Sequence, residues 1–163
     1  MVRRGVSVYL EVFTLVGVAL LGSAMVFAAV SRYAPSAAGA GVSVSDLTIR
    51  QGSGAALERM VVSDTGTTPI PGLVVATSGV APGAEFCYSA SNVATSGAIA
   101  ATCPGLEAMP SAVTLSIEVA PGESVVVAFA VEGSAFAVGS TSSVIVTASN
   151  GAQAVASATV LPA

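Results

Sequence analysis

Two patterns of apolar and polar residues divide the chain. Between Val12 and Val30 the sequence VFTLVGVALLGSAMVFAAV carries no charged residue. At ~1.5 Å per residue a helix over this stretch measures roughly 28 Å, about one bilayer hydrocarbon core. Beyond Gly41 apolar and polar residues instead alternate, which is the period of half-buried β-strands. The predicted fold class is therefore α+β, with a long N-terminal hydrophobic helix followed by an immunoglobulin-like antiparallel β-sandwich.

The two patterns also set the predicted domain boundaries. We expect a leader at residues 1–5, a hydrophobic helix over 6–34, a hinge over 35–41 and a β-sandwich domain over 42–163. Pro35 ends the helix, and the Ser, Ala and Gly residues that follow are typical of a short flexible hinge.

Seven or eight short strands are predicted in the sandwich domain. The apolar face switches near Asp46, which predicts a β-bulge, and Asn150-Gly151 predicts a hairpin turn of the type I′ class. Val125 to Val131 is apolar on both faces, so this strand is central or covered by a neighbouring subunit. Residues 89–106 predict an exposed loop. The expected strands are 42–50, 57–63, 73–77, 86–89, 113–119, 125–131, 144–148 and 154–161.

The residues that flank the apolar run bear on its role. Arg3, Arg4 and Gly5 precede it and Arg32 follows it, and the positive-inside bias then leaves the N-terminus in the cytoplasm and exports the rest. A secretory signal peptide would have a shorter apolar run that ends at a small-residue cleavage site. A permanent signal anchor needs only the length and flanks that are present. The third alternative starts from Gly5, a small residue placed before the run and directly after two arginines.

The order Arg3-Arg4-Gly5/Val6-Ser7-Val8-Tyr9-Leu10-Glu11, followed by an unbroken apolar segment, resembles the class III leader of type IV pilins and archaellins. The resemblance implies that a prepilin peptidase cuts between Gly5 and Val6 on the cytoplasmic side. Many bacterial pilins carry a glutamate at the fifth mature position, whereas Glu11 would be the sixth; archaeal members often lack it. The short leader and the all-β domain look more like the archaeal branch, as does Val61 to Ile70, which resembles a strand and turn of archaeal pilin and archaellin head domains.

Membership of this family implies an assembly function. The precursor would wait in the cytoplasmic membrane, and membrane assembly machinery would then pull the hydrophobic helix into a homo-oligomeric helical filament on the cell surface. Small residues along the helix would let backbones approach closely in the polymer. The residues expected in the polymerisation helix are Glu11, Val12, Phe13, Leu15, Gly17, Ala19, Leu20, Gly22, Ala24 and Phe27.

Composition narrows the classes of function. The chain of 163 residues has a formal net charge of −4 and is 9% charged, against ~25% in ordinary soluble domains. An acidic surface repels phosphate backbones, so nucleic-acid binding by a basic patch is disfavoured. A surface so poor in charge suits packing against like subunits or a coat of glycan.

Candidate chemistry is sparse. Histidine is absent, as is lysine, and these residues usually support acid–base catalysis at neutral pH. We therefore expect no enzyme, no cofactor and no metal site, and the scattered acids are predicted to be solvated. Cys87 and Cys103 predict a structural disulfide, as is usual for two cysteines in an exported domain.

The function predicted from the sequence is a pilin, the structural subunit of an extracellular archaeal type IV pilus-like filament used for adhesion or aggregation. An archaellin, the subunit of a motility filament, shares the same plan. A membrane-anchored extracellular β-sandwich binding module is the alternative from a different class.

Overall fold

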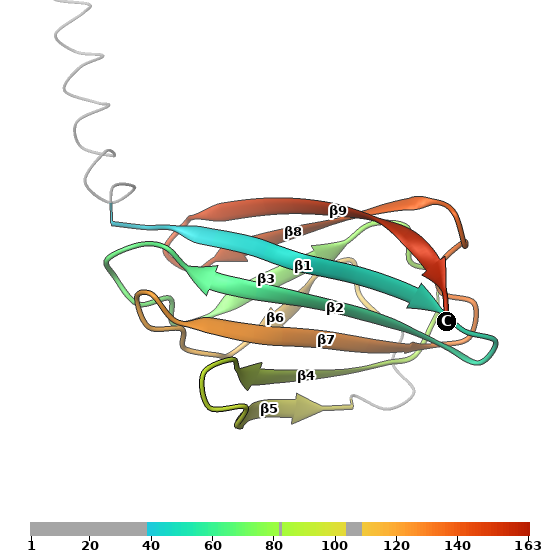
Figure 1. The fold of residues 1–163 in the computed structure, drawn as a ribbon, viewed down its shortest axis with the longest axis horizontal. Helices are drawn as coiled ribbons and strands as arrows, with labels where there is room; N and C mark the ends of the chain where they lie inside the picture. Colours follow the sequence, from blue (N-terminus) through green and yellow to red (C-terminus); the bar gives the residue numbers. More distant parts are fainter. Residues whose placement is uncertain (1–38, 82, 104–108) are drawn as a thin grey trace, which may run out of the picture. The chain divides into compact units, whose positions relative to one another are not determined.

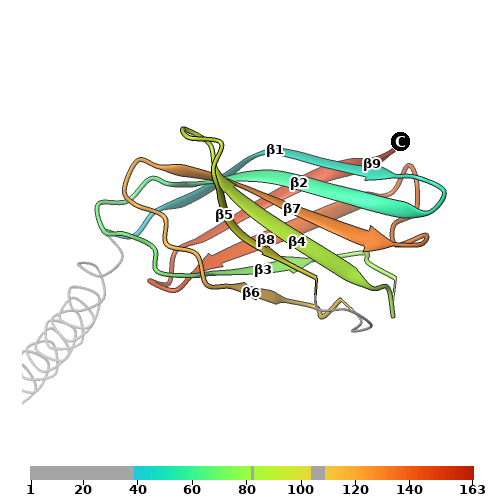
Figure 2. The same ribbon diagram turned by 90° about the horizontal axis from the view of Figure 1, so that it is seen from below.

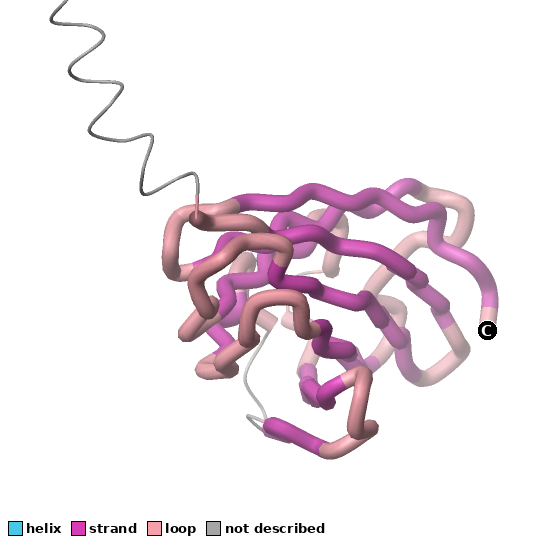
Figure 3. The backbone as a smooth tube through the Cα atoms, turned by 60° about the vertical axis from the view of Figure 1, so that its left-hand side comes forward, coloured by secondary structure: helices cyan, strands magenta, loops and turns pink. Residues whose placement is uncertain are grey.

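A computed structural model gives the fold, and it describes residues 39–81, 83–103 and 109–163. Throughout these ranges the regular elements are β-strands, as the tube in Figure 3 shows. The described residues form nine strands: β1 (Val42–Gln51), β2 (Ala55–Asp64), β3 (Leu73–Thr77), β4 (Phe86–Asn92), β5 (Ala98–Thr102), β6 (Val113–Leu115), β7 (Ser124–Glu132), β8 (Thr141–Ala148) and β9 (Gln153–Pro162).

The strands form one sheet in the order β5-β4-β7-β2-β1-β9-β8-β3-β6 (Figure 1). The sheet curls so that β2 and β7 lie in one layer and β3 and β6 in the other (Figure 2). Neighbouring strands are antiparallel except β1 and β9, which pair in parallel from Ile49 opposite Val160 to Gln51 opposite Pro162. This short parallel ladder joins the two layers into a continuous sheet.

The predicted fold class was therefore wrong. The part of the chain that the structure describes is all-β rather than α+β, and the sheet is mixed rather than wholly antiparallel. The helix was predicted for residues 6–34, which lie outside the described residues. Strand direction was missed because alternation of apolar and polar residues is the same whether a strand runs parallel or antiparallel to its neighbour.

The core lies between the two layers and follows the alternation in the sequence. On β7, Val125, Val127, Phe129 and Val131 are all buried. This strand lies between β2 and β4, so its predicted central position is confirmed. The alternation of residues 113–119 is also confirmed, because Val113, Leu115, Ile117 and Val119 are buried. Only Val113–Leu115 form β6, and the segment ends with an isolated bridge between Val119 and Ile70.

The predicted bulge in β1 is confirmed, and the predicted β8–β9 hairpin is confirmed in position but not in turn type. The register of β1 on β2 shifts between Ser45 and Thr48, and Asp46 has a φ of 51°, which together define the expected bulge. The predicted hairpin joins β8 and β9, and Gly151 has a φ of 91°, a conformation that favours glycine. The predicted type I′ turn was wrong, because it requires a positive φ at Asn150 as well, and Asn150 does not have one. The Asn150 side chain accepts a hydrogen bond from the Ala152 amide at 3.2 Å.

One buried side chain that the sequence did not single out ties distant segments together. Gln51, at the end of β1, donates from Nε2 to the carbonyl of Gly133 at 2.8 Å. Its Oε1 accepts a hydrogen bond from the Phe136 amide at 2.9 Å. Both bonds fix the connection between β7 and β8, which brings the buried Phe136 into the core.

Candidate assembly surface

The residues predicted for processing and polymerisation precede the β domain. The cleavage pair Gly5 and Val6 and the polymerisation residues from Glu11 to Phe27 lie outside the described residues. Among the residues that are described, none belongs to a helix of the length and hydropathy that crossing a bilayer requires.

The start of the β domain is held by a turn between β2 and β3. The carbonyl of Gly39 accepts hydrogen bonds from the Thr67 amide at 2.9 Å and the Thr68 hydroxyl at 2.9 Å. The carbonyl of Gly41 accepts one from the Thr65 amide at 3.2 Å. Residues 39–41 belong to the segment predicted as a hinge, and these bonds attach them directly to the turn.

Glycine permits this close approach. A Cβ atom on Gly41 would lie 2.6 Å from Thr65 Oγ1 and 2.7 Å from the Gly66 nitrogen, and one on Gly66 would collide with the carbonyl oxygen of Gly39. The Asp64 carboxylate shapes the same turn, since its Oδ1 accepts a hydrogen bond from the Gly66 amide at 2.7 Å. The sequence marked this turn by its residue types, but it did not show that residues 39–41 pack on it.

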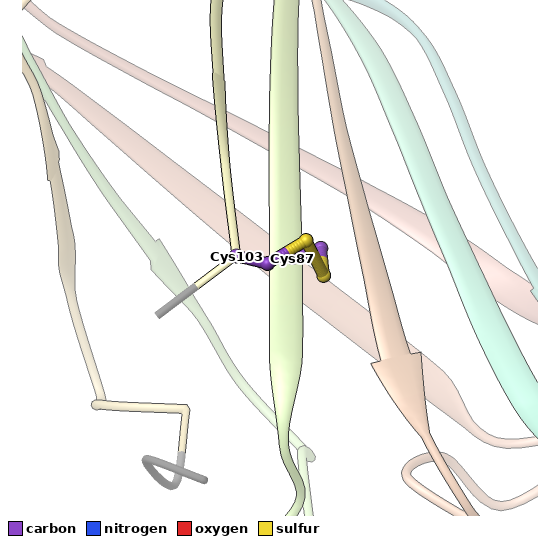
Figure 4. The surroundings of a disulfide bond; sticks show 2 residues. All are labelled: Cys87 and Cys103. Carbon is purple, nitrogen blue, oxygen red and sulfur yellow. A yellow bond between two sulfur atoms is a disulfide. The ribbon is translucent and has the colours of Figure 1, made fainter. Parts of the chain in front are cut away.

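The predicted disulfide is present. Cys87 on β4 and Cys103, just beyond β5, are joined with an S–S distance of 2.05 Å and a Cα–Cα distance of 4.1 Å (Figure 4). Residues 89–106 were predicted to be an exposed loop. They instead contain β5, which pairs with β4 from Tyr88 opposite Thr102 to Ser91 opposite Ala98. The sequence did not indicate this strand, because β5 is mostly exposed and its residues, AIAAT, do not alternate between apolar and polar.

Two shallow hollows adjoin the disulfide on the outside of the β2-β7-β4 layer. Their volumes are about 350 and 210 Å³, and both are lined by Cys87, Cys103 and Ala130. Leu57, with 47% of its surface exposed, borders the larger hollow, and Glu85 and Glu132 border the smaller one. The hollows have the volume and the mostly apolar lining to receive an apolar side chain. Their lining residues include no paired acid and base for catalysis.

The structure buries two acids that were predicted to be solvated. Glu58 is 0% exposed and Asp64 1% exposed. Both follow the inward alternation of β2, which also buries Ala56, Met60 and Val62. That alternation was the signal in the sequence, because Glu58 stands two residues before Met60 on the same face.

Glu58 lies in an apolar environment. In register it stands beside Ile49 on β1 and Phe129 on β7. Its Oε1 accepts a hydrogen bond from the Thr77 hydroxyl at 3.1 Å, and its Oε2 has no hydrogen-bond partner among the described residues. Burial raises the pKa of Glu58 to about 7, although the bond from Thr77 lowers it in part.

A metal site is not formed by the side chains that the structure places. No group of three or more His, Cys, Asp or Glu residues comes together among them. Asp46 stands on the bulge of β1, and Glu118 is exposed on the segment after β6.

Comparisons with known proteins give distant likenesses. No family model matches the chain, and no curated protein matches it. Similar solved structures include the archaeal flagellum of Methanospirillum hungatei strain JF1, at 13% identity over 96% of this chain and 92% of that one, with a TM-score of 0.39.

Two further solved structures are similar over about three quarters of this chain. The archaellum periplasmic stator complex of FlaF and FlaG from Sulfolobus acidocaldarius is 12% identical over 72% of this chain and 87% of that one, with a TM-score of 0.40. AvmM, which catalyses a macrocyclization in alchivemycin A biosynthesis, is 11% identical over 77% and 90%, with a TM-score of 0.42. Archaellum components are thus among the neighbours, but at these TM-scores the likenesses carry no argument about function.

Proposed function

We propose that this chain is the structural subunit of an extracellular, archaeal pilus-like filament. The observation that carries the proposal is the order of its parts. Arg3, Arg4 and Gly5 stand before an uncharged apolar stretch from Val12 to Val30, which leads into a disulfide-bonded β domain. Its role is assembly rather than catalysis.

The β domain has properties that support export. Disulfides persist in oxidising surroundings outside the cytosol, and Cys87 and Cys103 are both used in one. The positive-inside bias also favours a β domain that lies outside the cytosol.

The apolar stretch supports polymerisation. While it is in the membrane, lipid covers its side chains. On leaving the membrane the same side chains would cost on the order of 25 cal/mol for each Å² exposed to water. Burial against the same stretch of neighbouring copies removes that cost, and removal of residues 1–5 by a prepilin peptidase frees the chain for this exchange.

Two measurements on protein recovered from cells test the proposal. N-terminal analysis is expected to give a mature chain that begins Val6-Ser7-Val8, and electron microscopy is expected to show helically ordered fibres. A chain that begins at Met1 in a detergent-soluble monomer would overturn the proposal and favour a membrane-anchored binding module. Fibres that rotate in swimming cells would identify a motility filament instead of a pilus used for adhesion.

A further inference from the structure

The outer face of β8 and β9 carries a regular array of uncharged side chains. Residues of β8 alternate between buried and outward positions, and the register pairs each outward residue of β8 with one of β9. We call the ladder face the six residues of three consecutive outward pairs: Thr141 with Thr159, Ser143 with Ser157, and Ile145 with Val155.

The ladder face presents apolar surface to solvent. Val155 is 66% exposed and Ile145, directly opposite, is 43% exposed. Ala76 on β3 continues this row beyond Ile145. A hydrogen bond of 2.9 Å joins the hydroxyls of Ser143 and Ser157. Most of these side chains are short or β-branched, so little rotamer entropy is lost when a partner covers them.

The strands around the ladder face carry no charged residue, and the charged residue next to them in sequence is Glu118, exposed on the segment after β6. The strands β3, β6, β8 and β9 contain no Asp, Glu, Arg or Lys. In the described sheet, charged residues lie instead on β1, β2 and β7. Arg50 on β1 stands beside Leu161 of β9, beyond the last pair of the ladder face.

The apolar pair of the ladder face lies near one end of the domain. Because β1 and β9 run parallel, both strands begin at the same end of the domain (Figure 1). The chain enters β1 at that end, directly after Gly39 to Gly41. Val155 is the third residue of β9, so the apolar pair lies toward the end of the domain at which β1 begins.

We propose that the ladder face is a docking surface for a neighbouring copy of this chain. Copies whose acids outnumber their arginines repel where those acids face one another, whereas the ladder face allows close approach without burying a charge. This inference rests on the proposed function, since the filament brings copies together, and it adds a contact made by the β domain to the one made by the apolar stretch.

Photo-cross-linking of the full-length chain tests the contact. A benzophenone amino acid replaces Val155, and in a matched control it replaces Val138, which is 55% exposed outside the strands. Irradiation of protein recovered from cells is expected to give a covalent dimer from position 155 at a yield at least tenfold above that from position 138. Mass spectrometry of the dimer then identifies the peptide of the second copy.

Other products from position 155 would overturn the inference. These are adducts with lipid alone, adducts with an unrelated protein, sugar attached to the ladder residues, or monomer alone. Because the probe replaces one exposed side chain, misfolding is checked by intact-mass measurement of the Cys87–Cys103 disulfide in the same sample.

Charge substitution separates this inference from the proposed function. Val155→Asp is expected to reduce the amount of filament at least tenfold, whereas Val138→Asp leaves it unchanged. If the natural chain forms fibres and Val155→Asp forms as many, the docking surface is wrong while the filament stands. If the natural chain forms no fibres but position 155 still yields dimers, the proposed filament is wrong while the docking surface stands.

Discussion

Glu58 places a carboxyl group in the apolar interior of the β domain. One oxygen is bonded to Thr77 and the other has no partner among the described residues. Burial of an ionised carboxylate is costly, so the protonated form is favoured there. The sign of the resulting pH dependence follows from linkage. The pKa of Glu58 rises from 4.5 to about 7 on folding, so between these two pH values the folded state binds more protons than the unfolded state does. The contribution of the Glu58 carboxyl to stability is therefore fully present below about pH 4.5 and is lost as the pH rises through about 7.

Glu58→Gln is expected to remove most of this pH dependence. Glutamine has nearly the same size and retains an oxygen that accepts the Thr77 hydrogen bond, but it does not ionise. Above pH 7 the variant should exceed the natural chain in free energy of unfolding by about 3 kcal/mol, while the two should be similar near pH 4. Denaturant unfolding in detergent between pH 4 and pH 8 measures the free energy of unfolding of the variant and of the natural chain.

The control for this prediction is Glu118→Gln, which removes an exposed carboxyl from the segment after β6. It should retain the pH dependence of the natural chain. If Glu58→Gln also retains that dependence, the buried carboxyl is not its source.

Gly66 tests the attachment of residues 39–41 to the turn. A methyl group there would meet the carbonyl oxygen of Gly39 and the Gly41 nitrogen, so the two segments must separate. Gly66→Ala is expected to destabilise the domain by about 1–3 kcal/mol, measured by thermal unfolding. Gly54→Ala is the matched control, because a Cβ atom on Gly54 has nothing within 4 Å. Equal melting temperatures for the two variants would contradict the close packing.

At the level of elements, alternation predicted the strands that have one buried face. Leu73–Thr77 was predicted to the residue, and β1, β2, β8 and β9 were predicted within a few residues of their ends. β5 was missed because neither of its faces is well buried. The neighbours of each strand in the sheet were not predictable, since pairing depends on contacts between segments far apart in sequence.

The residues of the candidate site also differ in whether the sequence alone predicted them. Cys87 and Cys103 were predicted because two exported cysteines have few alternatives. The ladder face was not predicted, because its six residues acquire a common role only when β8 pairs with β9. The inward position of Glu58 was readable from Met60 and Val62, but a general expectation that acids are solvated prevailed over the local pattern.

The disulfide fixes the β4–β5 hairpin, and its removal has a predictable cost. Replacing Cys87 and Cys103 together with alanine is expected to destabilise the domain by about 3 kcal/mol, because the unfolded chain regains the freedom that the closed loop removes. Thermal unfolding under oxidising conditions measures the change. Reduction of the natural chain with a thiol is the control and should lower its melting temperature to a similar value. An unchanged melting temperature in the double variant would exclude a stabilising role.

For the whole molecule, the distribution of charge links folding to assembly. The stretch Val12–Val30 and the strands β3, β6, β8 and β9 carry no charged residue. Such surfaces can be buried between copies without the cost of removing a charge from water. The exposed charged residues of β1, β2 and β7 remain available to keep the outside of an assembly hydrated; they are Asp46, Arg50, Arg59 and Glu132. The proposed subunit therefore requires two independent conditions, a folded β domain and an apolar stretch free of charge.

Ala19→Arg separates these two conditions. An arginine in the middle of the apolar stretch would be buried without a partner when copies pack together, which costs several kcal/mol for each subunit. We expect filaments to be absent in electron micrographs, while the β domain keeps its disulfide and its thermal unfolding transition. Ser36→Arg adds the same charge beyond the apolar stretch and should leave filaments intact, so it controls for net charge and expression. Normal fibres from Ala19→Arg would show that the stretch is not the centre of the polymer, and loss of the β domain's own transition would show that the two parts do not fold independently.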